Sequence, residues 1–265
     1  MKIGFIGCGN MAQAMISGIL TNKYAKKQDV MASNRSTQIL DIMHEKTGIR
    51  VTPDNREVAA FSELLVLSVK PQIYPKVIEE IKESIHPDTL VVSIAPGISL
   101  EQLEKGFGRS LAFVRCMPNT PAMVLEGMTA FVPSRRLDAR QVEIVQSFLS
   151  SFGQCVEVSE SQMDAVVAVS GSSPAYVFMF IEAMADAAVK QGLPRNLAYT
   201  MAAQSVLGSA KMVLETGKHP AVLKDMVCSP AGTTIEAVQV LEKQGFRSAV
   251  IEAMEACADK SRGLK

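Results

Sequence analysis

The sequence of 265 residues lacks the features that mark nucleic-acid-binding and membrane proteins. Its 27 Lys and Arg residues equal its 27 Asp and Glu residues in number, and the basic residues are spread along the chain, so no electrostatic footprint for nucleic acid or an anionic membrane is present. No run of about 18 apolar residues occurs, and glycines interrupt the apolar N-terminus before it reaches signal-peptide length. We therefore expect a cytoplasmic protein with no nucleic-acid or membrane partner.

Cysteine and histidine are also poorly placed for metal or disulfide chemistry. The five cysteines are odd in number, far apart and free of any C-x-x-C, which argues against a disulfide framework and a zinc cluster and fits a reducing compartment. No His, Cys and carboxylate cluster has ligand spacing, so we expect no metal. Of the three histidines, His44 and His86 lie in polar stretches, and His219 is expected to hydrogen-bond locally.

Short β-branched runs alternate with amphipathic stretches over the first 160 residues. Strands are predicted at 2–7, 29–33, 64–69, 89–95, 110–117, 128–134 and 154–159. Strands separated by helical patterns are typical of βαβ units and a mostly parallel sheet. The sequence therefore predicts an α/β protein whose N-terminal domain, residues 1–160, is a Rossmann domain.

From residue 161 onward the pattern becomes helical. Helices are predicted at 174–194, 195–217, 232–243 and 246–262. The first of these is apolar over most of its surface, apart from a thin polar stripe of Glu182, Asp186 and Lys190, and such a helix needs neighbours on several sides. We expect residues 161–265 to form an all-helical domain that is partly buried against a second copy of the chain.

A glycine fingerprint marks the first strand-to-helix junction. Gly7-x-Gly9-x-x-Ala12 follows the first predicted strand and runs into an amphipathic helix. Glycines at this turn let the backbone approach a pyrophosphate, which then lies at the positive N-terminus of the helix. The position predicts a dinucleotide site, with the alternative that the glycines serve only the steric needs of the turn.

The end of the second strand indicates which dinucleotide is bound. An NAD site usually has Asp or Glu here for the ribose hydroxyls, whereas this chain has Asn34 and Arg35. The guanidinium suits a 2′-phosphate, so NADPH is expected, with NADH as a second possibility. The alternative is that Arg35 is only a solvated loop residue.

Open α/β sheets hold their ligands at the carboxyl ends of their strands. The residues that follow three later strands are therefore candidate site residues. Lys70 and Pro71 follow one strand and could face a cofactor or substrate anion. Ala95 follows the next, where small residues leave room for a nicotinamide ring. Asn119 follows the third, and its side-chain amide can hydrogen-bond a ligand.

The expected active site lacks a strong acid. A dehydrogenase acting on an alcohol or ketone needs a general acid or base, and no suitable side chain stands out. A protonated C=N substrate carries its own proton and needs mainly orientation. The turn Gly232-Thr233-Thr234 at a predicted helix start has backbone N–H groups and two hydroxyls that can bind a carboxylate. The alternative is that the threonines only cap the helix.

The chain resembles the pyrroline-5-carboxylate reductase family essentially from end to end. The resemblance rests on FIGCGNM (5–11), MASNR (31–35), TPDN (52–55), SVKPQ (68–72), RCMPNTP (115–121), SGSSPAY (170–176), GLPR (192–195) and HPAVLKDMVCSPAGTTIEAVQVLE (219–242). The last block is the most specific. Family members commonly have Gly-Ala-Thr or Gly-Ser-Thr where this chain has Gly232-Thr233-Thr234, and Gly-Ser-Gly-Pro where it has Gly171-Ser172-Ser173-Pro174.

The resemblance implies reduction of 1-pyrroline-5-carboxylate to L-proline by an NAD(P)H-dependent homodimer, with five dimers often forming a decamer. It implies that substrate is bound by Ser172, Ser173, Gly232, Thr233 and Thr234, with the Thr234 hydroxyl near the ring nitrogen as the catalytic group. The implied cofactor contacts are Ile6, Gly7, Cys8, Gly9, Asn10, Met11, Asn34, Arg35, Asn55, Val69, Lys70, Pro71 and Ala95.

Two other functions share parts of this pattern. A β-hydroxyacid dehydrogenase has the same domain plan, but it would carry a lysine early in the helix after Gly171, and none occurs before Lys190. A non-catalytic NADP(H)-binding regulator would keep the glycine turn but would not need the hydroxyl-rich turns at Ser172 and Gly232.

Overall fold

The computed structural model describes residues 1–263, which divide into two compact units. The first comprises residues 1–172 together with the C-terminal segment from Ala258, and the second comprises Ser173–Cys257. Each unit is described by itself. The sequence-based domain boundary after residue 160 stays a prediction.

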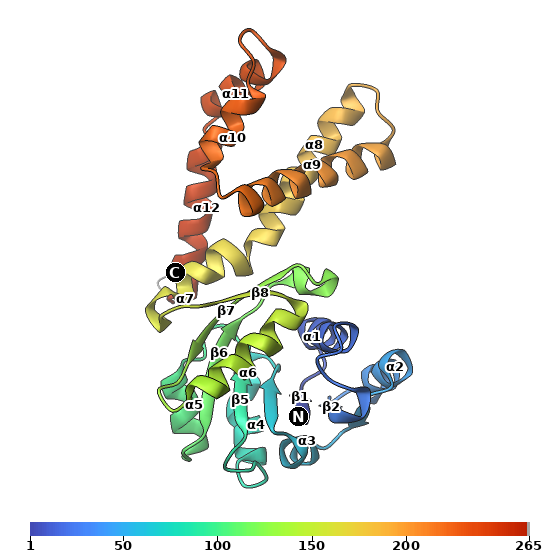
Figure 1. Ribbon diagram of the computed structural model, residues 1–265, viewed down its shortest axis with the longest axis vertical. Coiled ribbons are helices and arrows are strands. Elements are labelled where there is room, and N and C mark those ends of the chain that lie inside the picture. Colours follow the sequence, from blue (N-terminus) through green and yellow to red (C-terminus); the bar gives the residue numbers. More distant parts are fainter. Residues whose placement is uncertain (264–265) are drawn as a thin grey trace. The chain divides into compact units, whose positions relative to one another are not determined.

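The first unit is built on one eight-stranded sheet with the order β3-β2-β1-β4-β5-β6-β7-β8 (Figure 1). Neighbouring strands are parallel, except for the antiparallel pair β6 and β7. The strand order reverses at β1, so the first strand-to-helix turn lies at the topological switch point where such sheets bind ligands. The strands are β1 (Ile3–Ile6), β2 (Val30–Ser33), β3 (Arg50–Thr52), β4 (Leu64–Leu67), β5 (Leu90–Ser93), β6 (Ala112–Met117), β7 (Gly127–Pro133) and β8 (Gly153–Glu157).

Helices cover both faces of this sheet. Apolar side chains of α1, α2 and α6 pack in one core cluster, and those of α3, α4 and α5 pack in another. Because both faces are covered, β1, β2, β4 and β5 are buried at every residue. The α-helices of this unit are α1 (Asn10–Thr21), α2 (Thr37–Thr47), α3 (Asn55–Phe61), α4 (Tyr74–Ile81), α5 (Leu100–Phe107), α6 (Ala139–Leu149) and α7 (Met163–Val166).

Short helical turns complete the first unit. A π-helical turn, η6 (Val167–Gly171), continues α7. The 3-10 turns are η1 (Lys27–Asp29), η2 (Pro71–Ile73), η3 (Thr120–Val124), η4 (Ser150–Phe152) and η5 (Glu160–Gln162).

The second unit is helical and exposes many large apolar side chains. Its elements are α8 (Ser173–Lys190), α9 (Arg195–Thr216), α10 (Pro220–Val227), α11 (Thr233–Lys243) and most of α12 (Phe246–Ser261). Phe178, Met179 and Leu214 are 63%, 69% and 82% exposed in the single chain. By length and composition alone the continuous helical stretch Glu160–Lys190 could cross a membrane, but one such helix is weak evidence.

The Rossmann sheet and the C-terminal helical region confirm the predicted fold class. All seven predicted strands occur, whereas β3 is not predicted because it has only three residues. The sequence pattern also does not predict α10, which begins directly at Pro220. His219 is the N-cap residue of α10, and its Nδ1 accepts a hydrogen bond from Ala221 N at 3.2 Å, which confirms its expected local role.

Candidate active site

The glycine turn closes tightly between β1 and α1. Gly7 has φ of +95°, a conformation that glycine adopts readily, and a Cβ atom there would lie 2.9 Å from the Ser68 backbone and the Val69 side chain. Gly9 is the N-cap residue of α1, and a Cβ there would meet no atom within 4 Å. The turn therefore combines a forced glycine with open space in front of a helix N-terminus, where backbone N–H groups can receive an anion.

Ser68 fastens the glycine turn to the neighbouring strand. Its hydroxyl lies 3.0 Å from Ile6 O and 2.7 Å from Gly7 O, both of which accept hydrogen bonds. Ser68 was not among the predicted site residues. The sequence offered one signal for it, a hydroxyl directly after a buried strand, but only the strand order places that strand beside β1.

Buried ionisable groups at this edge remain neutral. Burial raises the pKa of the Cys8 thiol to about 11. Burial likewise raises the pKa of Tyr74 to about 12, and the Tyr74 hydroxyl donates to Leu67 O at 2.6 Å and lies 3.0 Å from Ser93 Oγ. Tyr74 thus joins the ends of β4 and β5 as a structural group.

The end of β2 contacts the glycine turn through Asn34. Asn34 Oδ1 accepts a hydrogen bond from Cys8 N at 3.2 Å, while Arg35 is exposed. Asn55 contacts the last residue of β2: its Oδ1 accepts from Ser33 Oγ at 2.7 Å, and its Nδ2 donates to Glu80 at 3.0 Å. A neutral amide and an exposed guanidinium suit a phosphorylated ribose better than a hydroxyl-binding carboxylate would.

The remaining predicted cofactor residues lie at the same edge of the sheet. Lys70 is exposed at the N-cap of η2, and Pro71 is the first residue of that turn. Val69 is half-buried after β4, and Ala95 is buried after β5. Together with Ile6–Met11, Asn34, Arg35 and Asn55, these residues follow the carboxyl ends of adjacent parallel strands. The residues present fit a dinucleotide.

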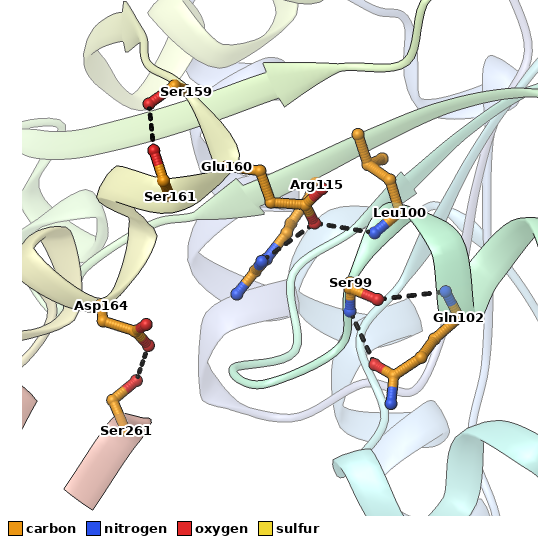
Figure 2. Close-up of polar contacts among 9 residues, drawn as sticks. All are labelled: Ser99, Leu100, Gln102, Arg115, Ser159, Glu160, Ser161, Asp164 and Ser261. Atoms are coloured by element: carbon orange, nitrogen blue, oxygen red, sulfur yellow. Dashed lines mark hydrogen bonds and ion pairs between the residues drawn. The ribbon is translucent and has the colours of Figure 1, made fainter. Parts of the chain in front are cut away.

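A polar network supports the segment that leads to Ser172 (Figure 2). Glu160 Oε1 accepts from Arg115 Nη1 at 3.0 Å and from Leu100 N at 2.9 Å, so one carboxylate joins β6 to the start of α5. Asp164 Oδ1 accepts from Ser261 Oγ at 2.6 Å. Ser172 follows the π-helical turn and is the last residue of the first unit before the chain enters the second unit.

Asn119 uses its amide inside the protein, contrary to the expectation that it grips a ligand. Its Oδ1 accepts from Met128 N at 2.8 Å, and its Nδ2 donates to Ser170 O at 3.2 Å. The backbone of β7 and of the π-helical turn thereby occupies both ends of the side chain.

The other predicted substrate residues belong to the second unit. Ser173 begins α8, and Gly232, Thr233 and Thr234 form the start of α11. Thr233 is exposed and Thr234 is half-buried. The expectation that the threonines cap this helix is wrong, because Gly232 is the N-cap residue and the threonines are already helical. Their hydroxyls and the first N–H groups of the helix lie at one terminus.

The turn before Gly232 is tight. Gly232 N donates to Ser229 O at 3.0 Å, with Pro230 and Ala231 as the central residues. Ala231 has φ of +56°, which is a strained value for a residue with a side chain. The chain thus enters α11 through a constrained turn that sets the direction of its first N–H groups.

The fold and the glycine turn define a Rossmann-type oxidoreductase that uses a nicotinamide dinucleotide. Residues 2–97 match the family model "NADP oxidoreductase coenzyme F420-dependent", and residues 160–264 match "Pyrroline-5-carboxylate reductase dimerisation". Relatives of that name match nearly the whole chain, so it belongs to the pyrroline-5-carboxylate reductase family.

Full-length relatives place the chain in the same family. It is 50% identical over 263 residues to the pyrroline-5-carboxylate reductase of Escherichia coli (strain K12), covering 99% of this chain and 98% of that protein. It is 39% identical over 269 residues to pyrroline-5-carboxylate reductase 2 of Homo sapiens, covering 100% and 84%.

Solved structures agree. A pyrroline-5-carboxylate reductase from Coxiella burnetii has a TM-score of 0.92 at 37% identity, covering 100% of this chain and 98% of that one. A pyrroline carboxylate reductase of Plasmodium falciparum with NADP bound has a TM-score of 0.90 at 33% identity, covering 99% and 97%.

Proposed function

We propose that this chain reduces 1-pyrroline-5-carboxylate to L-proline with NADPH, the last step of proline biosynthesis. The observation that carries this proposal is the 50% identity over nearly the whole chain to a reductase of that name. The scarcity of strong acids among the candidate site residues supports it, because a protonated imine brings its own proton to the reaction.

The cofactor half of the proposed site is the edge of the first unit. Residues Ile6–Met11 bind the pyrophosphate, Asn34, Arg35 and Asn55 bind the phosphorylated ribose, and Val69–Pro71 and Ala95 border the nicotinamide. The forced glycine at position 7 and the open space at Gly9 support this assignment. When bound, NADPH, or NADH in its place, would supply the hydride that the ring C=N carbon receives.

The substrate half holds a carboxylate and orients the ring nitrogen. N–H groups of Gly232, Thr233 and Thr234 and the hydroxyls of Ser172 and Ser173 bind the carboxylate. The Thr234 hydroxyl oxygen accepts a hydrogen bond from the protonated ring nitrogen, which keeps its proton and becomes a secondary amine. The position of Gly232–Thr234 at the start of α11 supports the carboxylate contacts, because a helix N-terminus favours an anion.

The proposed assembly is a homodimer formed through the helical domain, with five dimers in a decamer. Exposed apolar side chains on α8 and α9 and the match to a dimerisation model support the dimer. We place the protein in the cytoplasm, without a nucleic-acid or membrane partner, so that the apolar stretch within Glu160–Lys190 is covered by protein instead of lipid.

Oxidation of NADPH in the presence of pyrroline-5-carboxylate tests the proposed activity. Purified protein should consume the nicotinamide absorbance when the imine is added, and proline should appear in equal amount. A 2-hydroxy acid or a 3-hydroxy acid with NADP should give no reduction. The proposed function is wrong if NADPH is stable with the imine at micromolar protein.

A further inference from the structure

Asn119 has both ends of its side-chain amide bonded to backbone groups. It lies two residues after β6 and is only 9% exposed. The partners determine how the amide is oriented, because Met128 N can only donate and Ser170 O can only accept. The oxygen therefore faces β7, and the NH₂ group faces the π-helical turn.

The carbonyl of Ser170 needs a donor because of the sequence that follows it. In a regular α-helix this carbonyl would accept from the N–H of residue 174, but residue 174 is proline and has none. The ring of Pro174 would also collide with that carbonyl. The chain forms a π-helical turn instead, in which Ser172 N donates to Val167 O at 2.8 Å. Asn119 supplies the donor that Pro174 lacks.

The end of β6 also approaches this turn closely. A Cβ atom on Gly171 would lie 2.5 Å from Met117 Cε, so Met117 and Asn119 both contact the turn from the same strand exit. π-helical turns are rare and occur frequently at functional sites. The residue directly after this π-helical turn is Ser172.

We propose that Asn119 is a positioning residue, which fixes the turn at Ser170–Ser172 so that Ser172 can bind the carboxylate of the imine. This inference rests on the proposed function. Asn119 acts through the Ser170 carbonyl and does not itself touch the substrate.

The test compares Asn119→Asp with a matched control, Asn22→Asp. Aspartate at position 119 keeps the size and the acceptor for Met128 N but places an oxygen against Ser170 O. Asn22 makes the same kind of bond elsewhere, since its Nδ2 donates to Ser151 O at 2.7 Å at the C-cap of α1. The control therefore removes an equivalent bond without affecting the turn.

Steady-state kinetics and cofactor binding give the first readout. We expect Asn119→Asp to raise KM for pyrroline-5-carboxylate by about tenfold or more, the effect of one lost hydrogen bond to a buried partner, with the Kd for NADPH within about twofold of wild type. Asn22→Asp should leave both constants unchanged. Wild-type KM in Asn119→Asp, or an equal change in the control, would overturn the inference.

Hydrogen exchange gives a second readout that does not depend on activity. Amides in peptides covering 163–176 should exchange faster in Asn119→Asp than in wild type or Asn22→Asp, because the turn has lost its anchor. Unchanged exchange there means that Asn119 does not hold the turn. An inactive wild-type protein would instead overturn the proposed function, while the exchange result still decides the role of Asn119.

Discussion

At the scale of single residues, Ser68 fastens the glycine turn at Gly7, and Asn119 bonds to the π-helical turn. The role of Gly7 was predicted from the sequence, whereas the roles of Ser68 and Asn119 were not. Gly7 is required by its positive φ and by the atoms around it, and this requirement was predicted from the fingerprint. Ser68 was not predicted, because its role comes from a strand that is distant in the sequence. Asn119 was predicted to bind a ligand, and the residues that it contacts instead lie 9 and 51 positions away.

Thr234 carries the residue-scale prediction for catalysis. Thr234→Ala should lower kcat/KM for pyrroline-5-carboxylate by roughly tenfold to a thousandfold, because it removes one strong hydrogen bond to the reacting nitrogen. The Kd for NADPH should not change. Thr234→Ser keeps the hydroxyl and should recover most of the activity. Unchanged kinetics in the alanine variant would remove Thr234 from the mechanism.

Tyr74 makes stability depend on alkaline pH. Its pKa rises from 10.0 in the unfolded chain to about 12 in the buried site. Between these values the unfolded state loses the proton while the folded state keeps it. The contribution of Tyr74 to the free energy of unfolding is therefore fully present below pH 10 and is lost as the pH rises toward 12. The loss is roughly 2–3 kcal/mol.

Urea denaturation at pH 8 and pH 11 measures this effect. Tyr74→Phe cannot ionise, so its free energy of unfolding should change less with pH than that of wild type, although its value at pH 8 is lower because the hydrogen bond to Leu67 O is lost. An identical pH dependence in both proteins would contradict the assignment.

At the scale of elements, polar contacts decide how short segments are held. The strands β1, β2, β4 and β5 were predictable because their residues are buried throughout and mostly apolar. The π-helical turn was not predictable, because it results from Pro174 together with a donor from Asn119, which follows β6. The segment Glu160–Gln162 likewise depends on Arg115, which lies 45 positions earlier.

The Glu160 carboxylate should contribute measurably to stability. Glu160→Ala leaves Arg115, whose side chain is 12% exposed, without its partner and also removes the acceptor for Leu100 N (Figure 2). We expect the free energy of unfolding in urea to fall by about 1–3 kcal/mol. Glu143→Ala, on the exposed side of α6, should change it by less than about 0.5 kcal/mol. Equal effects would show that the pair contributes nothing specific.

At the scale of the whole molecule, a single chain leaves large apolar side chains of α8 and α9 exposed to solvent. A groove between α8 and α9 is lined by Phe180, Met184, Val206 and Val213 together with the small residues Ser205, Ser209 and Ala210. Small residues allow a helix to approach closely, and large exposed apolar patches are typical of protein interfaces. The dimerisation model covers this region.

Ser209→Arg should disrupt the dimer. Residue 209 is exposed in the single chain, so arginine can be accommodated by the monomer fold but fills the groove. We expect the dissociation constant from sedimentation equilibrium to rise by about a hundredfold or more. Ser147→Arg, an exposed serine on α6, is the matched control and should leave the assembly unchanged. A dimer of wild-type affinity in Ser209→Arg would exclude this groove from the interface.

The sequence by itself determined the Rossmann sheet, the glycine turn and the helical C-terminal region, because hydrophobic period and glycine requirements act over a few neighbouring residues. Only the tertiary structure decided that Ser68 fastens the turn, that Asn119 holds Ser170 and that Glu160 pairs with Arg115. Hydrogen bonds of this kind depend on distances of about 3 Å between residues far apart in the chain, and no local pattern specifies them.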